Sequence, residues 1–299
     1  MTFVPKFKKA NSKLASGSVH TYLANIKRLS KMARNKTDYP EGGSWLSKKG
    51  LLAAVNKLPL NARKILAAAA VKASRIYGTK VPAFEKLMMK SSKQFDKVRD
   101  SRTKTDREKK LWEDYSKVYK AGEKLWNSIK KDPESWKLKD LREAQSAYLL
   151  LLYGTHTPRG LESLKLPGKE GPNQLRKVKG GYDIILRDYK TAKSRGPSQF
   201  RLDPKLVNPT NVFVKGATRL NTHGFVFVNA NGGKLSKSSF SKLLTSATRK
   251  GGLKGVSVQL LRVFKSSSKE NREIIEKAEA LQKEMGHGQK ESKRYAKKP

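Results

Sequence analysis

The pattern of apolar and polar positions in the first third of the chain predicts a series of amphipathic helices. From residues 18–34, apolar side chains recur at intervals of three and four, with basic side chains between them. The same spacing predicts helices over residues 51–58, 60–77 and 81–97. Gly78 directly follows residues 60–77, at a position where glycine commonly ends a helix. This part of the chain is therefore expected to be all-helical.

The middle of the chain changes from charge-rich to apolar. Residues 100–110 are nearly all charged or Ser and Thr, which is typical of a linker or of an exposed helix start. A helix is expected over residues 107–130. Its aromatic side chains could stack on nucleic-acid bases or pack in a core, and their helical spacing favours the core. Residues 139–153, beyond Pro133, predict a strongly apolar helix.

Beyond Gly154 the pattern becomes mixed. Alternation at both ends of residues 182–202, around the turn sequence KSRGPS, predicts a β-hairpin. Residues 224–236 predict a strand followed by an Asn-Gly turn. Helical spacing then returns in four segments, which are residues 237–249, 256–266, 270–285 and 289–296.

These elements predict an α+β fold that is mainly α. We expect an all-helical N-terminal domain and a mixed domain with a small antiparallel sheet or β-hairpin. The predicted organisation is a disordered basic arm over residues 1–13, a helical domain over residues 14–105 and the mixed domain over residues 106–299.

The charge of the chain indicates a polyanionic partner. Lys and Arg total 66 against 25 Asp and Glu, a formal net charge of +41. A compact body with this charge repels itself unless a polyanion lies nearby. Nucleic acid is the natural partner, because Lys and Arg displace condensed counterions from phosphates, and a ribosomal or chromatin-type packing protein is the competing interpretation. No membrane partner is expected, because no apolar run approaches the length of a transmembrane helix.

Cysteine and histidine usage limits the chemistry. The chain has no Cys, which excludes disulfides, thiolate zinc sites and cysteine nucleophiles. The four histidines are scattered at positions 20, 156, 223 and 287, so a histidine metal cluster is not expected.

Two arginines stand in apolar surroundings. Arg159 lies in the block LLLYGTHTPRGLESLKL, where we expect it to begin a helix, with Glu162 on the same face to orient it. Arg262 lies in GVSVQLLRVFKSS, where burial of an arginine requires an anionic partner, and a phosphate could supply one. Either arginine alone could be an ordinary surface residue.

Three more motifs complete an ordered set. The hairpin sequence DYKTAKSRG contains Lys190 and Lys193, MGH ends in His287, and Tyr295 stands in the basic tail. Together with the two arginine blocks, this order and spacing resemble the motifs of tyrosine recombinases, the family that includes phage-type integrases. The resemblance covers roughly residues 140–299. In addition, SVHTYLANIKRL (18–29) resembles part of that family's helical core-binding domain.

The resemblance implies a site-specific recombinase or integrase that cleaves and rejoins DNA through a 3′-phosphotyrosine intermediate. Residues 14–105 would be the core-binding domain and residues 106–299 the catalytic domain. Because the phosphotyrosine conserves the bond energy, no cofactor, ATP or metal would be required. The implied partners are double-stranded DNA and further copies of the chain, as a tetramer on two DNA sites. The implied location is inside a cell with DNA, in a mobile-element, phage or viral setting.

The resemblance also assigns roles to individual residues. Tyr295 would be the nucleophile, and Arg159 and Arg262 would neutralise the developing charge on the phosphate. His287 would add a third hydrogen-bond donor. Lys190 would protonate the leaving 5′-oxygen, with Lys193 as the alternative general acid.

One position departs from the family pattern. Relatives commonly have His three residues before the second arginine, where this chain has Gln259, which can donate a hydrogen bond but cannot exchange protons. Two alternatives therefore remain: a type IB topoisomerase that relaxes one duplex, or a non-catalytic basic DNA-binding protein with a recombinase fold.

Overall fold

The computed structural model describes the chain except residues 1, 158, 190, 222 and 285–299. It divides into two compact units, Met1–Lys104 and Thr105–Pro299. This division lies one residue from the boundary expected between residues 105 and 106.

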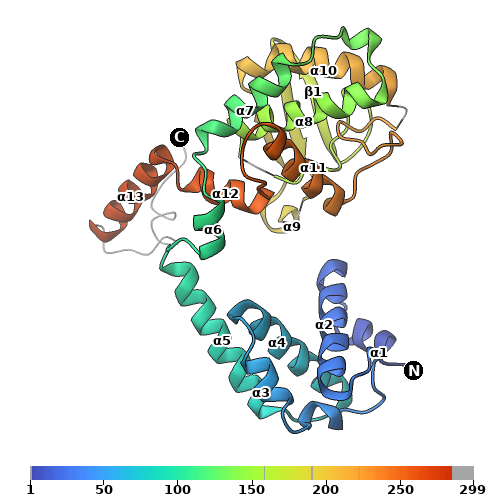
Figure 1. Ribbon diagram of the computed structural model, residues 1–299, viewed down its shortest axis with the longest axis vertical. Coiled ribbons are helices and arrows are strands. Elements are labelled where there is room, and N and C mark those ends of the chain that lie inside the picture. Colours follow the sequence, from blue (N-terminus) through green and yellow to red (C-terminus); the bar gives the residue numbers. More distant parts are fainter. Residues whose placement is uncertain (1, 158, 190, 222, 285–299) are drawn as a thin grey trace. The chain divides into compact units, whose positions relative to one another are not determined.

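The first unit is built from helices around a single apolar core (Figure 1). The helix over residues 60–77 has the bounds expected from the sequence, and Gly78 follows it in the left-handed conformation, with φ of 66°. The helical expectation for this unit is confirmed. Its helices are α1 (Phe3–Ala10), α2 (Ser16–Arg34), the 3₁₀ turn η1 (Ser44–Ser47), α3 (Leu51–Asn56), α4 (Leu60–Tyr77) and α5 (Pro82–Asp100).

The expectation of a disordered arm over residues 1–13 is wrong, because α1 lies there and packs on the core. Phe3 and Phe7 are buried one helical turn apart. The ring of Phe3 lies 4.9 Å from that of Tyr77 and 5.4 Å from that of Tyr39. Lys6, Lys8 and Lys9, on either side of Phe7, conceal this short apolar stripe in the sequence.

The second unit begins with helices that enclose its most buried element. The single helix expected over residues 107–130 is instead interrupted, and the Asp114 carboxylate accepts a hydrogen bond from the Ser116 amide at 2.8 Å where the second part begins. Trp112, Tyr115, Tyr119 and Trp126 are partly buried against the core, as their helical spacing favoured. These elements are α6 (Asp106–Leu111), α7 (Ser116–Asn127), η2 (Pro133–Ser135) and α8 (Leu138–Thr155), of which α8 is buried on nearly every side over its last three turns.

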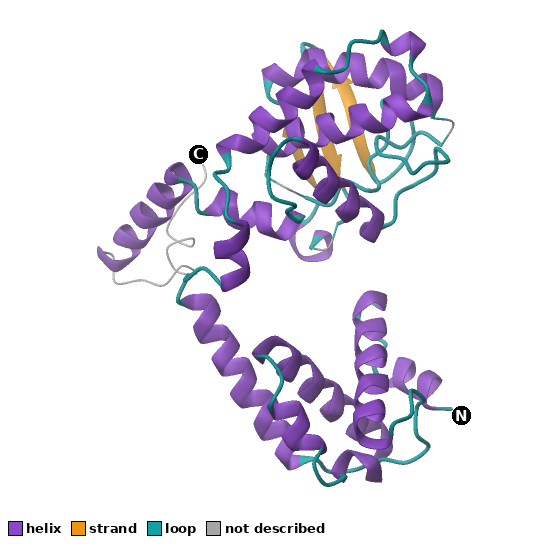
Figure 2. Cartoon of the chain, in the orientation of Figure 1, coloured by secondary structure: helices purple, strands orange, loops and turns teal. Residues whose placement is uncertain are grey.

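Three antiparallel strands form the sheet of the second unit, in the order β1-β2-β3 (Figure 2). In the described residues these are β1 (Asn173–Val178), β2 (Gly181–Leu186) and β3 (Ser198–Arg201). Strand β2 pairs with β3 from Asp183 opposite Arg201 to Leu186 opposite Ser198. The hairpin expected over residues 182–202 is therefore confirmed, and its turn contains the short helix α9 (Ala192–Arg195).

Two elements differ from the sequence expectations. Residues 224–236 contribute only isolated bridges, Phe225 with Lys165 and Val228 with Lys234, where a strand was expected. The helix α10 (Val207–Leu220) was not expected. It follows the turn η3 (Pro204–Leu206) and packs its Gly216 directly on the buried ring of Trp136.

The last described elements are three helices, α11 (Lys237–Lys250), α12 (Val258–Ser266) and α13 (Lys269–Glu284). They correspond to the segments expected over residues 237–249, 256–266 and 270–285. The segment 289–296 lies outside the described residues. With its small antiparallel sheet among many helices, the structure confirms an α+β, mainly α fold.

Candidate active site

A cleft of about 710 Å³ in the second unit brings together four segments that are far apart in the sequence. The loop after α8, the segment after β2, the start of α11 and the exposed side of α12 each contribute to its lining. Its lining residues are Thr157, Arg159, Gly160, Glu162, Ser163, Asp188, Tyr189, Thr191, Arg195, Lys234, Leu235, Ser236, Lys237 and Arg262.

The cleft carries an excess of positive charge. Among its described lining residues, the cationic side chains outnumber the two carboxylates, Glu162 and Asp188. The cations are Arg159, Arg195, Lys234, Lys237 and Arg262. Fixed cations that converge on one hollow attract an anion and hold it by charge-assisted hydrogen bonds.

Arg159 and Arg262, which belong to separate motifs of the sequence, line this same cleft. Their elements meet through Tyr153 near the end of α8, a residue that is 1% exposed. Burial raises the pKa of the Tyr153 phenol well above its usual range, while the nearby Arg262 guanidinium opposes that rise and the Glu162 carboxylate adds to it. The Tyr153 hydroxyl donates a hydrogen bond to the backbone carbonyl of Arg159. The buried Tyr153 thus holds the Arg159 segment by a hydrogen bond and lies within the electrostatic influence of Arg262.

The helix expected to begin at Arg159 is absent, and the reason lies in tertiary pairing. The Leu164 carbonyl accepts from the Val226 amide at 2.8 Å, and the Leu166 amide donates to the Gly224 carbonyl at 2.9 Å. The backbone groups that a helix would use are therefore committed to a neighbouring segment. Arg159 lies in the loop that leads into this pairing, and Leu161, Leu164 and Leu166 are buried as expected.

Glu162 also lines the cleft. Its carboxylate folds back over Gly160, so that a Cβ added at Gly160 would lie 2.7 Å from Glu162 Oε2. The absence of a side chain at Gly160 permits this close approach.

Arg262 is exposed on the surface of its apolar helix, where an anion could reach it. Helix α12 buries Leu260, Leu261 and Phe264 and turns Arg262 toward the cleft. Ser257 caps the helix by accepting a hydrogen bond from the Leu260 amide at 3.3 Å. Gln259, one turn before Arg262, is also exposed, but it is not among the described residues that line the cleft.

Helix α12 is fixed against the end of α8 by Lys265 and Tyr115. The Lys265 ammonium lies 5.3 Å from the centre of the Tyr115 ring and donates to the Thr155 carbonyl at 3.4 Å. The Tyr115 hydroxyl donates to the carbonyls of Tyr153 and His156, the latter at 3.0 Å. Burial raises the pKa of Tyr115 and lowers that of Lys265, so both groups belong to a desolvated contact. This contact keeps the Arg262 helix beside the Arg159 loop.

The segment after β2 reaches the cleft on both sides of Lys190. Tyr189 and Thr191, its neighbours in the chain, both line the cleft. Lys190 itself lies outside the described residues, and so does the side chain of Lys193, whose backbone belongs to α9. His287 and Tyr295 also lie outside the described residues.

Other cleft residues were not singled out by the sequence analysis. Lys234, Ser236 and Lys237 come directly before or at the start of α11, and Ser236 caps that helix by accepting from the Ser239 amide at 3.1 Å. Basic residues around a serine that follows an Asn-Gly-Gly turn could have indicated a cationic helix start. Arg195 and Tyr189 had no comparable signal, because only the hairpin's fold brings them to the cleft.

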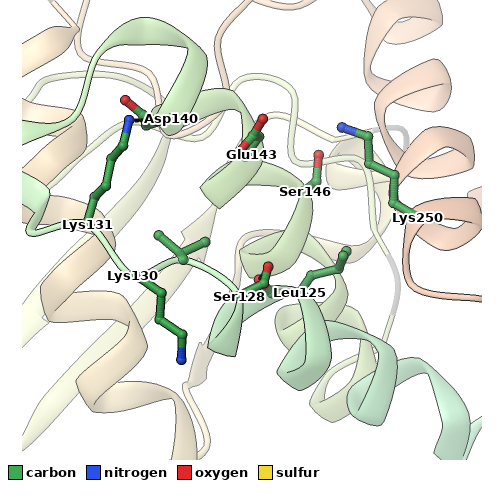
Figure 3. A pocket seen from close by; sticks show the side chains of 9 residues that line it. Leu125, Ser128, Lys130, Lys131, Asp140, Glu143, Ser146 and Lys250 are labelled. Carbon is green, nitrogen blue, oxygen red and sulfur yellow. Dashed lines mark hydrogen bonds and ion pairs between the residues drawn. The ribbon is translucent and has the colours of Figure 1, made fainter.

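A second pocket, of about 340 Å³, lies between the end of α7 and the first half of α8, with Lys250 at the end of α11 beside it (Figure 3). Leu125 and Ile129 supply apolar surface, and an ion pair of 2.7 Å joins Lys131 to Asp140 at its rim. None of the site residues expected from the sequence is among its described lining residues.

Among the described residues, no three or more His, Asp and Glu side chains gather as a metal-binding group. None of the helices in the described part of the chain has the length and apolar character needed to span a bilayer.

Comparisons of the chain with protein-family models, with curated proteins and with solved structures gave no match.

Proposed function

We propose that this chain is a tyrosine-type DNA strand transferase, a site-specific recombinase or integrase. One observation carries the proposal: Arg159 and Arg262 line a single cationic cleft, together with the residues on both sides of Lys190. An isolated pair of surface arginines has no reason to converge with the hairpin motif in this way. The partner we propose is double-stranded DNA, because the chain carries a formal net charge of +41.

In the proposed reaction, the Tyr295 oxygen attacks a backbone phosphorus and gives its proton to water. The bond from phosphorus to the 5′-oxygen breaks, the leaving oxygen takes a proton from Lys190, and a 3′-phosphotyrosine remains. Arg159 and Arg262 neutralise the charge that grows on the non-bridging oxygens, and His287 adds a donor. Attack by a DNA 5′-hydroxyl on the phosphotyrosine reverses these steps and rejoins the strand.

Exchange between two duplexes needs more than one copy of the chain, so we propose that it acts as a multimer on two DNA sites. The first unit would hold the duplex through the exposed basic side chains of α2 and α4, such as Lys27, Arg28 and Arg75. Such contacts to phosphate position a protein on DNA without specifying its sequence.

The test is to incubate the protein with a nicked or suicide DNA site and to search for a covalent adduct. Wild type should form the adduct, while Tyr295→Phe should bind the same DNA and form none. The proposal fails if wild type binds DNA without ever forming an adduct, or if Tyr295→Phe forms it equally well.

Gln259 favours a second candidate, a DNA-binding protein of the same fold without catalysis. Its amide cannot exchange protons as a histidine would at this position. This candidate predicts that Arg159→Ala and Arg262→Ala weaken DNA binding slightly and change nothing else. The adduct assay separates the two candidates.

A further inference from the structure

Two side chains tie the segment after β2 to the loop that carries Arg159. One is the buried amide of Asn173 at the start of β1, and the other is the ring of Tyr189 in the cleft.

Asn173 uses its full hydrogen-bonding capacity for this link. Its Nδ2 group donates to Ser163 Oγ and to the Asp188 carbonyl, both at 2.8 Å. Its Oδ1 atom accepts from the amides of Arg187 at 2.9 Å and Asp188 at 3.0 Å. An Asn side chain has two donor hydrogens and two acceptor lone pairs, so none is left unused. Because Asn173 is only 1% exposed, these bonds hold the two segments at a fixed spacing without competition from water.

Tyr189 follows this anchored backbone directly and is itself fixed at its far end. Its hydroxyl donates to the Gly196 carbonyl at 2.7 Å, across the turn that contains α9. Gly196 has φ of 71°, a conformation that other residues rarely adopt, so the carbonyl is presented by a position suited to glycine. The anchored backbone thus holds one end of the ring, and the hydroxyl bond holds the other.

The Arg159 guanidinium lies over this ring, with Cζ 5.5 Å from the ring centre. Both residues line the cleft. An aromatic face attracts a guanidinium through its quadrupole and leaves the N–H donors free. A carboxylate would instead neutralise the arginine and occupy the donors that an anion needs. Among neighbouring cations such as Arg195 and Arg262, which repel Arg159, a neutral support orients the side chain and preserves its charge.

We propose that Tyr189 is the positioning residue of Arg159, holding its guanidinium ready for an anion in the cleft. Since Tyr189 precedes Lys190, the same ring makes the placement of Arg159 depend on the hairpin that carries the proposed general acid. This dependence rests on the proposed function, whereas the ring contact does not.

The contact is tested in the DNA-free protein by the Arg159 side-chain Nε–Hε resonance, assigned through Arg159→Lys. Ring currents should shift it upfield in wild type and in Tyr189→Phe, which keeps the ring. Tyr189→Leu should return it to the ordinary arginine position, while the Arg262 resonance stays in place. An Arg159 resonance that is unaffected by Tyr189→Leu would overturn the proposal. If Tyr189→Leu does not fold, the contact is tested in wild type by the nuclear Overhauser effect between Arg159 and the Tyr189 ring protons. Absence of this effect would also overturn the proposal.

The consequence is tested by adduct formation at saturating DNA. Tyr189→Leu should slow it about threefold to tenfold, more than Tyr189→Phe does, with DNA affinity little changed. In an Arg159→Ala background, Tyr189→Leu should cause no further slowing, because the group that it positions is gone. Equal slowing in both backgrounds would refute the positioning role. Absence of any adduct in wild type contradicts the proposed function alone, and the resonance measurement still decides the contact.

Discussion

Replacing Tyr153 with Phe removes one hydroxyl beneath the Arg159 loop and leaves the ring in place. Tyr153 is 1% exposed, and its hydroxyl donates to the Arg159 carbonyl. A neutral hydrogen bond contributes about 0.5–1.5 kcal/mol, and a fully buried carbonyl left without a partner costs up to about 3 kcal/mol. Arg159 is only partly buried, so water can reach the freed carbonyl. We therefore expect the free energy of unfolding to fall by about 1 kcal/mol, near the lower end of these values. This lowers the Tm of a unit of this size by about 2–4 °C.

Tyr182→Phe is the matched control. Tyr182 is 3% exposed, and its hydroxyl donates to Asn211 Oδ1 at 2.8 Å, between β2 and α10. Neither Tyr182 nor Asn211 is among the described residues that line the cleft. The two variants should thus lose similar stability in urea or thermal unfolding.

The two variants should differ in their rates of adduct formation. A loosened Arg159 misplaces a group that acts on the transition state, and we expect Tyr153→Phe to slow adduct formation about tenfold at saturating DNA. Tyr182→Phe should cleave at the wild-type rate. Equal rates for the two variants, at equal loss of stability, would refute the inference that Tyr153 holds the Arg159 backbone in place.

Three further expectations follow. The Asp203 amide donates to His156 Nε2 at 3.1 Å, and burial, aided by Lys265, lowers the pKa of His156, so its neutral form is favoured in the folded state. As pH falls below about 6.5, the unfolded chain binds a proton at this histidine that the folded chain does not. The free energy of unfolding in urea should therefore fall between about pH 7.5 and pH 5.5. The fall should be smaller in His156→Gln. Gly216→Ala should destabilise by about 1–3 kcal/mol in thermal unfolding, because its Cβ would lie 2.2 Å from the Trp136 ring, whereas Gly17→Ala, which meets nothing within 4 Å, should not. DNA affinity measured by fluorescence anisotropy should fall by about 10³–10⁵ between roughly 50 and 200 mM salt if some ten phosphates are contacted, and a flat response would exclude that footprint.

The sequence predicts those elements whose spacing is long and regular. Helix α4 has the bounds predicted from its alanine-rich apolar period, and Gly78 ends it as expected. The alternation on both sides of KSRGPS predicts the β2-β3 hairpin correctly. In each case local preference and tertiary packing agree.

Where the prediction fails, contacts between distant segments decide the structure. Leucines near Arg159 suit a helix, but residues 224–226 take their backbone hydrogen bonds and draw the segment into a loop. Helix α10 contains Pro209, which a first helical turn tolerates, and Gly216, whose missing side chain admits Trp136. The contact of Gly216 with Trp136 joins segments that are distant in the sequence, so no local pattern predicts it.

Part of the candidate site can be predicted from the sequence. The motif resemblance selects Arg159 and Arg262, and the structure brings both into one cleft. Tyr189 and Lys234 carry no such signal, because their contribution exists only after the hairpin and the start of α11 meet. A side chain that acts by supporting another is identified by its contacts and not by its type.

The central claim is that Arg159 and Arg262 act on one phosphate, and a double-mutant cycle on adduct formation tests it most directly. Loss of one such donor typically costs about 10²–10³ in rate. Groups that clamp the same transition state are strongly non-additive, so Arg159→Ala combined with Arg262→Ala should be little slower than either single variant. Rate losses that multiply as independent factors, or single variants that cleave at the wild-type rate, would contradict the account.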